Sequence, residues 1–263
     1  MYINTADINV QFILALAIGA FVGGAAGYLG TLMLSKRMAL VAGPLGHLTL
    51  PGIALALTIG FDVSLGAFPM VVLGIVLIWL FEIRSKLPME ALTAVVFASG
   101  VAIAFLFLPE EKTIPALIGD ISQISFLTAA ITVILCLIIL AATRRIYPKM
   151  VMISISEDLA HAEGIDVRKY NLIYLTCIAL TVSLGVRIVG GIMTAALVAI
   201  PACTSSNLSR NLSDYSYRGM ILGSSACILG VIGFMLTSIA AGLLIILISS
   251  FFFLVSLAFK RFP

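Results

Sequence analysis

The stretch around which the sequence is organised reads Ala42-Gly43-Pro44-Leu45-Gly46-His47-Leu48-Thr49-Leu50-Pro51-Gly52, with long apolar runs on both sides. Pro44 and Pro51 lack an amide donor, so the carbonyls near Leu40 and His47 lose their helical partners. Broken backbone at membrane depth is tolerated only where it packs inside protein or lines a wet cavity, and transporters build substrate sites this way. The stretch therefore predicts a translocation pathway beside His47. The residues predicted to line this pathway are Gly43, Pro44, His47, Thr49 and Pro51.

The composition places the chain in a membrane. Hydrophobic residues make up 62% of the sequence and charged residues only 10%, and the mean hydropathy is +1.21. Soluble domains carry roughly 25% charged residues, so we predict a multi-pass protein of the plasma or inner membrane. A formal net charge of +3 is too small to indicate nucleic-acid binding. The first ten residues contain no Lys or Arg, so the first apolar run is expected to be a retained span rather than a cleaved signal peptide.

Apolar runs of about 20 residues, the length that crosses a bilayer as a helix, occur repeatedly. They predict an all-α, polytopic transmembrane bundle of about nine spans, forming one domain over residues 1–263. The candidate spans are 10–34, 38–60, 63–83, 88–108, 123–143, 170–186, 188–207, 219–237 and 240–259. The breaks at Gly185 to Arg187 and near Ser238 are short, so either flanking pair could instead be one span plus a half-helix.

Basic residues alternate between the predicted loops, which indicates the orientation of the chain. One set of alternate loops holds Lys36, Arg37, Arg84, Lys86, Arg144, Arg145, Lys149, Arg168, Lys169, Arg210, Arg218, Lys260 and Arg261. The opposite loops hold Lys112 and Arg187. The pattern predicts an N-terminus outside and a C-terminus in the cytoplasm.

Two stripes of small residues favour close helix packing. Gly19, Gly23 and Gly27 follow Ala15 at four-residue spacing, and Gly191, Ala195, Ala199 and Cys203 repeat the pattern later. The first stripe suits either packing within one bundle or a subunit interface.

The longest predicted cytoplasmic loop, Arg144 to Lys169, contains the pattern of a short helix. Ser154 stands three residues before Glu157, as in a capping box, and Gly164 suits a C-terminal stop. We expect a helix over Glu157 to Glu163, within a segment of about 154–166. Two turns do not persist alone in water, so this helix must dock either on its own bundle or on a cytoplasmic partner.

The sequence lacks the nucleotide-binding motif of an ATPase and the common catalytic motifs of an enzyme. It contains no GxxxxGK[ST], HExxH or GxSxG motif, and its acidic residues lie in predicted loops or near predicted helix ends. Proton-coupled and sodium-coupled carriers usually bury a carboxylate, so energy is expected to come from another subunit. An ATP-independent carrier or channel is the alternative.

Three segments resemble the membrane permease of zinc, manganese and iron ABC importers. They are residues 37–54, with Leu45-x-His47-x-x-Leu50-Pro51-Gly52; residues 157–165; and residues 187–202. The resemblance implies a dimeric permease, two cytoplasmic ATP-binding subunits and an extracytoplasmic metal-binding protein. It implies ATPase coupling through Glu157, Asp158, Leu159, Ala160 and Gly164. Metal would be cargo, ATP would bind the partner subunit, and this chain would bind no cofactor.

The family's second-helix motif usually reads Gly-Asp-Ala-Leu-Ser-His, with an Asp four residues before the His. Here His47 is kept, but Gly43 occupies the Asp position. His47 is thus the one metal ligand that the resemblance implies, and Thr49, the freed carbonyls and Cys203 are candidates to complete a site. A purely structural His47, or a metal chelate or small solute as cargo, are the alternatives.

Overall fold

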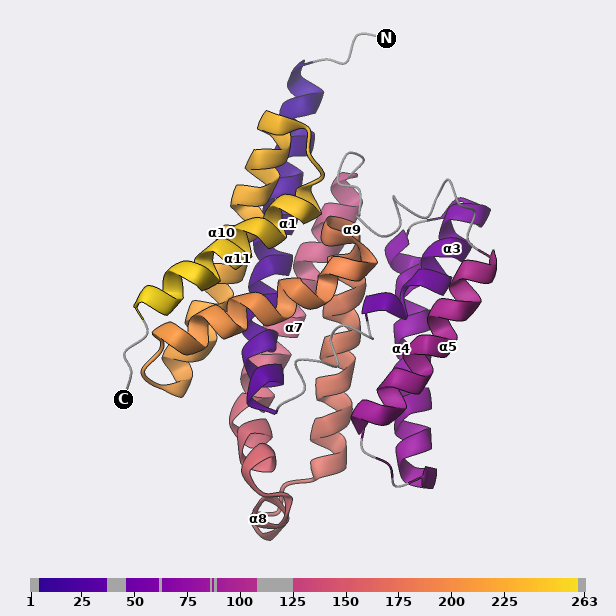
Figure 1. Ribbon diagram of the computed structural model, residues 1–263, viewed down its shortest axis with the longest axis vertical. Helices are drawn as coiled ribbons and strands as arrows, with labels where there is room; N and C mark the ends of the chain where they lie inside the picture. The colour runs from indigo at the N-terminus through magenta and orange to yellow at the C-terminus, as the bar shows by residue number, and fades with distance from the viewer. Residues whose placement is uncertain are drawn as a thin grey trace.

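The computed structural model describes residues 5–36, 46–61, 63–85, 87, 89–107 and 125–259, and these ranges contain helices but no strand (Figure 1). The helices are α1 (Thr5–Ser35), α3 (Leu50–Ile59), α4 (Val63–Ser85), α5 (Met89–Phe107), α7 (Phe126–Ile155), α8 (Glu157–Ala162), α9 (Val167–Leu208), α10 (Leu212–Thr237) and α11 (Ala241–Ala258). The predicted all-α fold is confirmed.

Five helices of the described ranges are long and apolar enough to cross a membrane. They are Val10–Ser35, Phe126–Ile155, Val167–Val186, Leu212–Thr237 and Ala241–Ala258. Shorter apolar helices are Leu65–Phe81, Ala91–Leu106 and Met193–Leu208. The ten residues of α3 rise about 15 Å, roughly half of the hydrocarbon thickness, so α3 by itself is too short to cross the bilayer. The count of nine spans and the orientation of the termini stay predictions.

Two of the predicted boundaries are wrong, and both errors have a local cause. The segment Arg144 to Ile155 is not a loop, because α7 continues through it; Arg and Lys are good helix formers and let a helix extend beyond an apolar run. The break within the sixth and seventh spans lies at Gly190 rather than at Gly185 to Arg187. Gly190 has φ 79° and ψ 170°, a conformation that is open mainly to glycine.

The boundary near Ser238 is confirmed. Helix α10 ends at Thr237, and Ser238 has a left-handed backbone with φ 57°. Helix α11 begins three residues later and packs back on α10, where a Cβ on Gly230 would collide with Ile245.

The first small-residue stripe is used for internal packing of α1 against α10. A Cβ on Gly23 would collide with the carbonyl of Gly223, and one on Gly27 would collide with the carbonyl of Gly219. The Ser224 hydroxyl also donates to the Ala20 carbonyl at 2.8 Å. The two backbones therefore touch, which is the arrangement that small residues permit in membrane helices.

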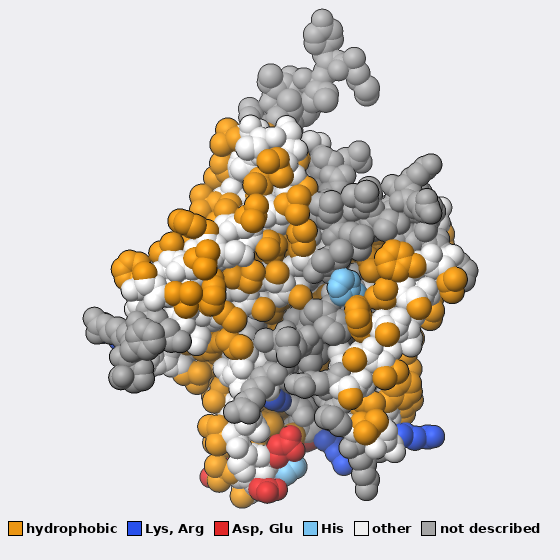
Figure 2. Space-filling view, viewed as in Figure 1, with side chains coloured by type: hydrophobic (Ala, Val, Ile, Leu, Met, Phe, Trp, Pro, Cys, Tyr) orange, Lys and Arg blue, Asp and Glu red, His pale blue; other side chains and the backbone are white. Residues whose placement is uncertain are grey.

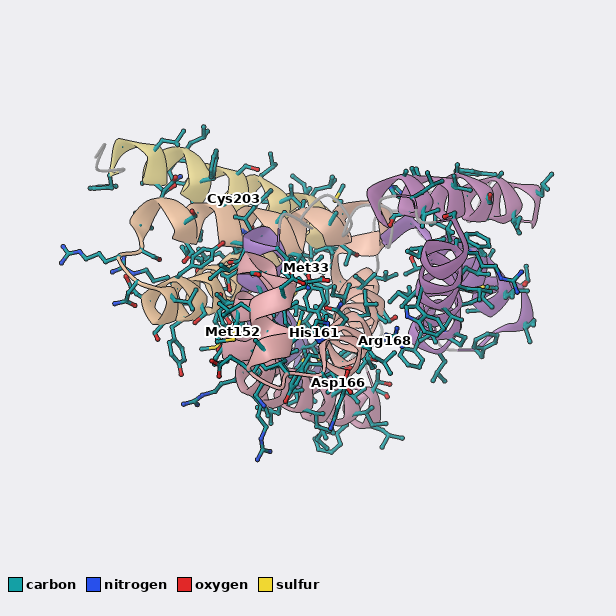
Figure 3. All side chains as sticks on the ribbon, turned by 90° about the horizontal axis from the view of Figure 1, so that it is seen from below. Met33, Met152, His161, Asp166, Arg168 and Cys203 are labelled. Atoms are coloured by element: carbon teal, nitrogen blue, oxygen red, sulfur yellow. The ribbon has the colours of Figure 1, made fainter. Side chains whose placement is uncertain are left out.

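Helices α3, α4 and α5 form a separate group at one side of the molecule, as the view from below shows (Figure 3). Their close contact is again between glycines, because a Cβ on Gly52 of α3 would collide with the carbonyl of Gly66 on α4. The group packs on the remaining helices mainly along a seam between α4 and α9. A small core at this seam contains Leu50, Ile53, Ala54, Ala67, Ala104 and Val186.

Two matched alanine substitutions test the α1–α10 contact. Gly23→Ala places a methyl group 2.6 Å from the Cys227 sulfur and against the Gly223 backbone, so we expect destabilisation of roughly 1–3 kcal/mol from overpacking. Gly19→Ala is the control, because its methyl meets Val231 at an ordinary 3.4 Å and alanine gains about 0.5–1 kcal/mol of helix stability over glycine. The measurement is the Tm of the detergent-purified protein, and equal shifts in both variants would contradict the contact.

Candidate functional site

Gly46 and His47 are helical, Leu48 and Thr49 form a turn, and a new helix, α3, begins at Leu50. Both the amide and the hydroxyl of Thr49 donate to the Gly46 carbonyl, and the Ile53 amide donates to the Thr49 carbonyl at 2.9 Å. Pro51 lies in the first turn of α3, where a missing N–H costs little. In this structure Pro51 therefore lies in the first turn of α3, and the helical backbone is interrupted just before it, at Leu48 and Thr49.

His47 itself is half-buried and lies against an aromatic side chain of α5. Its ring centroid is 5.1 Å from that of Phe97, with an angle of 49° between the ring planes. The adjacent Leu48 and Thr49 are buried. Among the predicted pathway residues that the structure describes, His47 is thus the one whose side chain is partly accessible, because Pro51 is buried as well.

The other predicted site residues divide into two sets. Gly43 and Pro44 lie outside the described residues. Cys203 is half-buried on the second arm of α9, on the side of the molecule away from α3, α4 and α5 (Figure 3). Within the described ranges, no three His, Cys, Asp or Glu side chains come together as they would around a metal ion.

The structure adds neighbours of His47 and Leu48 that the sequence did not predict. They are Phe97 on α5 and the two glycines that contact Leu48, namely Gly74 on α4 and Gly100 on α5. An apolar residue and isolated glycines in apolar helices carry no sequence signal for a site, so only the tertiary arrangement reveals them.

The short helix α8 forms at the predicted place with a different cap. Ser156, not Ser154, caps it: the Ser156 backbone is extended and its hydroxyl accepts a hydrogen bond from the Leu159 amide at 3.2 Å. Ser154 is still inside α7, where its hydroxyl donates to the Val151 carbonyl. At the other end, Gly164 has φ 71°, its amide donates to the His161 carbonyl, and the Ile165 amide donates to the Ala160 carbonyl at 2.9 Å. These bonds form a Schellman motif.

Helix α8 has one face toward the bundle and one toward solvent. Ala160 is fully buried, whereas Leu159 is 50% exposed and Glu157 and Asp158 are exposed. The helix lies at the lower end of the molecule, where most of the Lys and Arg side chains on the visible face also lie (Figures 1 and 2). Docking on its own bundle thus accounts for Ala160 but leaves an apolar side chain uncovered.

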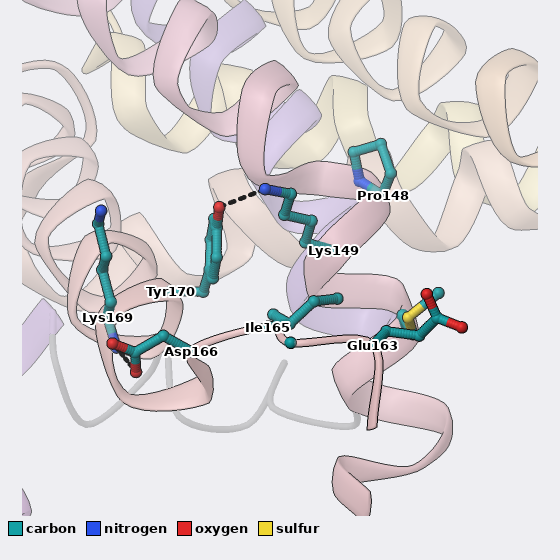
Figure 4. Close-up of a pocket in the computed structure, with 9 residues that line it drawn as sticks. Pro148, Lys149, Glu163, Ile165, Asp166, Lys169 and Tyr170 are labelled. Carbon is teal, nitrogen blue, oxygen red and sulfur yellow. Dashed lines mark hydrogen bonds between the residues drawn. The ribbon is translucent and has the colours of Figure 1, made fainter. Parts of the chain in front are cut away.

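A pocket of about 520 Å³ opens beside α8, between the end of α7 and the start of α9 (Figure 4). Its apolar side is formed by Pro148, Met152 and Ile165, and its rim carries charges of both signs. The Lys149 ammonium donates to the Tyr170 hydroxyl, and the Asp166 carboxylate caps α9 by accepting from the Lys169 amide.

Comparison with known proteins places the chain in a family. The sequence model described as the ABC 3 transport family matches residues 9–260, nearly the whole chain. The chain belongs to the ABC 3 transport family. The predicted resemblance to ABC transport permeases is therefore confirmed, as is a multi-pass protein of the plasma membrane.

Similar proteins in this family are described as permeases of metal uptake systems. The manganese import system permease protein ScaB of Streptococcus gordonii is 26% identical over 247 residues, covering 92% of this chain and 88% of ScaB. The high-affinity zinc uptake system membrane protein ZnuB of Buchnera aphidicola is 24% identical and covers 88% of this chain and 90% of ZnuB. Among solved structures, PsaBC from Streptococcus pneumoniae in complex with Fab superposes with a TM-score of 0.80 at 25% identity, covering 92% and 89% of the two chains.

The left-handed residue that ends α8 offers a test of this helix. Gly164→Val should cost about 1–2 kcal/mol, because a left-handed backbone is unfavourable for a side chain with a Cβ, while Gly164→Asn should be tolerated better. We expect faster hydrogen exchange at the amides of residue 164 and Ile165 in the valine variant, since these amides hold the end of α8. Identical exchange in both variants would show that the motif does not hold the helix.

Proposed function

We propose that this chain is the permease subunit of an ABC importer that carries a divalent transition-metal ion, namely zinc, manganese or iron. The observation that carries the proposal is the family match over residues 9–260. It is supported by the names of the relatives, which are described as manganese and zinc uptake permeases and align over most of their length. Residues 1–263 would act as one transmembrane domain that works by alternating access.

His47 is proposed to line the metal pathway. Its imidazole is half-buried within a largely apolar bundle, and ionisable groups inside membranes usually serve the transported ion. Neutral imidazole suits zinc and iron, whereas manganese prefers carboxylate, carbonyl and water oxygens. Gly43 leaves the carboxylate position of the family motif without an acid, and Cys203 lies on the side of the molecule away from α3, α4 and α5, so further ligands would have to come from the freed backbone carbonyls, Thr49 or a second subunit.

Helix α8 is proposed to dock on a separate ATP-binding subunit. The exposed Leu159 gives a partner an apolar contact, while the buried Ala160 fixes the helix to the bundle through its other face. Glu157, Asp158 and the left-handed Gly164 would shape the two ends of this contact. Helix α8 packs on α7 and on α9, so force applied to α8 would reach the beginning of α9.

A second permease subunit, an identical copy, and an extracytoplasmic metal-binding protein complete the proposed importer. The small residues of the α1 stripe are already covered by their contact with α10. The second stripe is less covered, because Ala195, Ala199 and Cys203 are only half-buried. It is therefore the more suitable of the two stripes for contact with another subunit. Two copies would also supply two His47 side chains.

A metal chelate or small solute is the second candidate cargo. The described part of the chain holds no group of three ligand side chains, and a chelated metal brings its own ligands. An importer of this kind needs shape and apolar contact at the pathway more than anionic ligands. Uptake assays with free and with chelated metal separate the two candidates.

The His47→Ala variant tests the pathway assignment. Loss of one ligand should raise the KM for uptake of the transported free metal by at least about tenfold, the lower end of what even indirect perturbation of a metal ligand costs. The measurement is uptake of radioactive zinc, manganese and iron by cells or proteoliposomes containing the full transporter. Thr176→Ala, which alters an exposed polar side chain on α9, is the matched control. Equal uptake of every ion by wild type and His47→Ala would remove His47 from the pathway.

The Leu159→Arg variant tests coupling through α8. An arginine at this 50% exposed position should abolish co-purification of the ATP-binding subunit or reduce it severely, because a charge would be placed in an apolar contact. Leu212→Arg, at a 43% exposed position at the start of α10, is the control. Loss of co-purification in both variants, or in neither, would contradict a specific role for α8.

A further inference from the structure

We propose that Leu48 is a positioning residue, which holds His47 against Phe97 by inserting into a socket made by Gly74 of α4 and Gly100 of α5. The inference rests on the proposed function, because it assigns His47 to one of two helix groups that would move relative to each other during transport. It implies that His47 travels with the α3–α4–α5 group and not with the larger group that contains α1 and α10.

The socket is formed by the space where two glycines lack side chains. Leu48 is only 4% exposed. A Cβ built on Gly74 would lie 2.5 Å from Cδ1 of Leu48, and one on Gly100 would lie 2.6 Å from Cδ2. Each terminal methyl of Leu48 thus occupies the position that a neighbouring side chain would need, so the leucine is held from two helices at once.

The same face of α5 contacts two successive residues of the turn. Phe97 and Gly100 are three residues apart and therefore neighbours on one side of the helix. Leu48 contacts this face at Gly100 while His47 lies on it at Phe97, 5.1 Å from ring centre to ring centre. A displacement of the Leu48 side chain would therefore move the adjacent histidine off the aromatic ring.

Two further attachments fix the turn to the same group. The Thr49 amide and hydroxyl both bond the Gly46 carbonyl, which closes the turn on both sides of His47 and Leu48. Four residues after Leu48, Gly52 contacts the backbone of Gly66 on α4. All of these contacts lie within the α3–α4–α5 group, which packs on the other helices mainly along the α4–α9 seam. Movement at that seam would carry His47 along with its surroundings intact.

The first experiment measures position without relying on transport. Cysteines replace His47 and Phe97, and their cross-linking by a short bifunctional thiol reagent is followed in the full chain in proteoliposomes. His47→Cys alone reports any background from the four native cysteines. Adding Leu48→Ala should slow cross-linking about tenfold or more, because loss of held geometry sharply lowers the effective concentration of paired groups. Leu55→Ala, at a 45% exposed position on α3, the helix that follows the turn, is the matched control.

A rescue variant separates positioning from a general loss of stability. Leu48→Ala combined with Gly74→Ala and Gly100→Ala returns two methyl groups to the socket near the lost Cδ1 and Cδ2 atoms. Cross-linking should recover in this triple variant by at least half of the loss. Unchanged cross-linking in Leu48→Ala, or no recovery in the triple variant although its Tm matches that of wild type, would overturn the inference.

Transport of the proposed cargo distinguishes the inference from the proposed function. With His47 and Phe97 in place, Leu48→Ala in the complete transporter should raise the KM for metal about tenfold, and the triple variant should restore the KM. Slower cross-linking together with an unchanged KM would overturn the assignment of His47 to the pathway while leaving the socket established.

Discussion

The bundle depends on how closely its helix backbones approach one another. In a bilayer, helices gain little from hiding apolar surface, because lipid is as apolar as the side chains, so close packing and hydrogen bonds between helices hold them together. Helix α1 meets α10 at Gly23 and Gly223 with no side chain between them, and meets α9 where Gly30 lies against the Val198 carbonyl. The Thr31 hydroxyl, 3.0 Å from that of Tyr147, adds a polar link to α7. The larger group is thus assembled around one helix.

The smaller group repeats this principle around a different pair of glycines, Gly52 and Gly66. Because the two groups share mainly the α4–α9 seam, each has its own internal contacts, and a change of their relative position need not disturb either interior. His47 belongs to the smaller group, whereas α8 is attached to the larger one through α7 and α9. The two proposed functional regions, the ATPase-docking helix α8 and the metal-binding residue His47, therefore lie on opposite sides of the seam.

The sequence was sufficient for the elements whose ends coincide with a change in polarity. The predicted spans 63–83 and 240–259 became Val63–Ser85 and Ala241–Ala258. The sequence was insufficient where more than one local structure was compatible with the residues. The basic segment after residue 143 continues α7 and does not form a loop. Gly190 rather than Gly185 has the non-helical backbone, and Ser156 rather than Ser154 caps α8. The surroundings of His47 could not be predicted from the sequence, because residues 47 and 48 contact Phe97, Gly74 and Gly100 only after α3, α4 and α5 have packed.

The α1–α10 contact also constrains the order in which the protein is made. Ribosomes deliver α1 to the membrane first, and its bonding partner Ser224 is 204 residues away along the chain from Ala20. At about 5–20 residues per second, the glycine surface of α1 must wait in lipid for roughly ten to forty seconds before α10 can cover it. During synthesis that surface faces lipid, and a nascent chain truncated before α10 would expose it permanently.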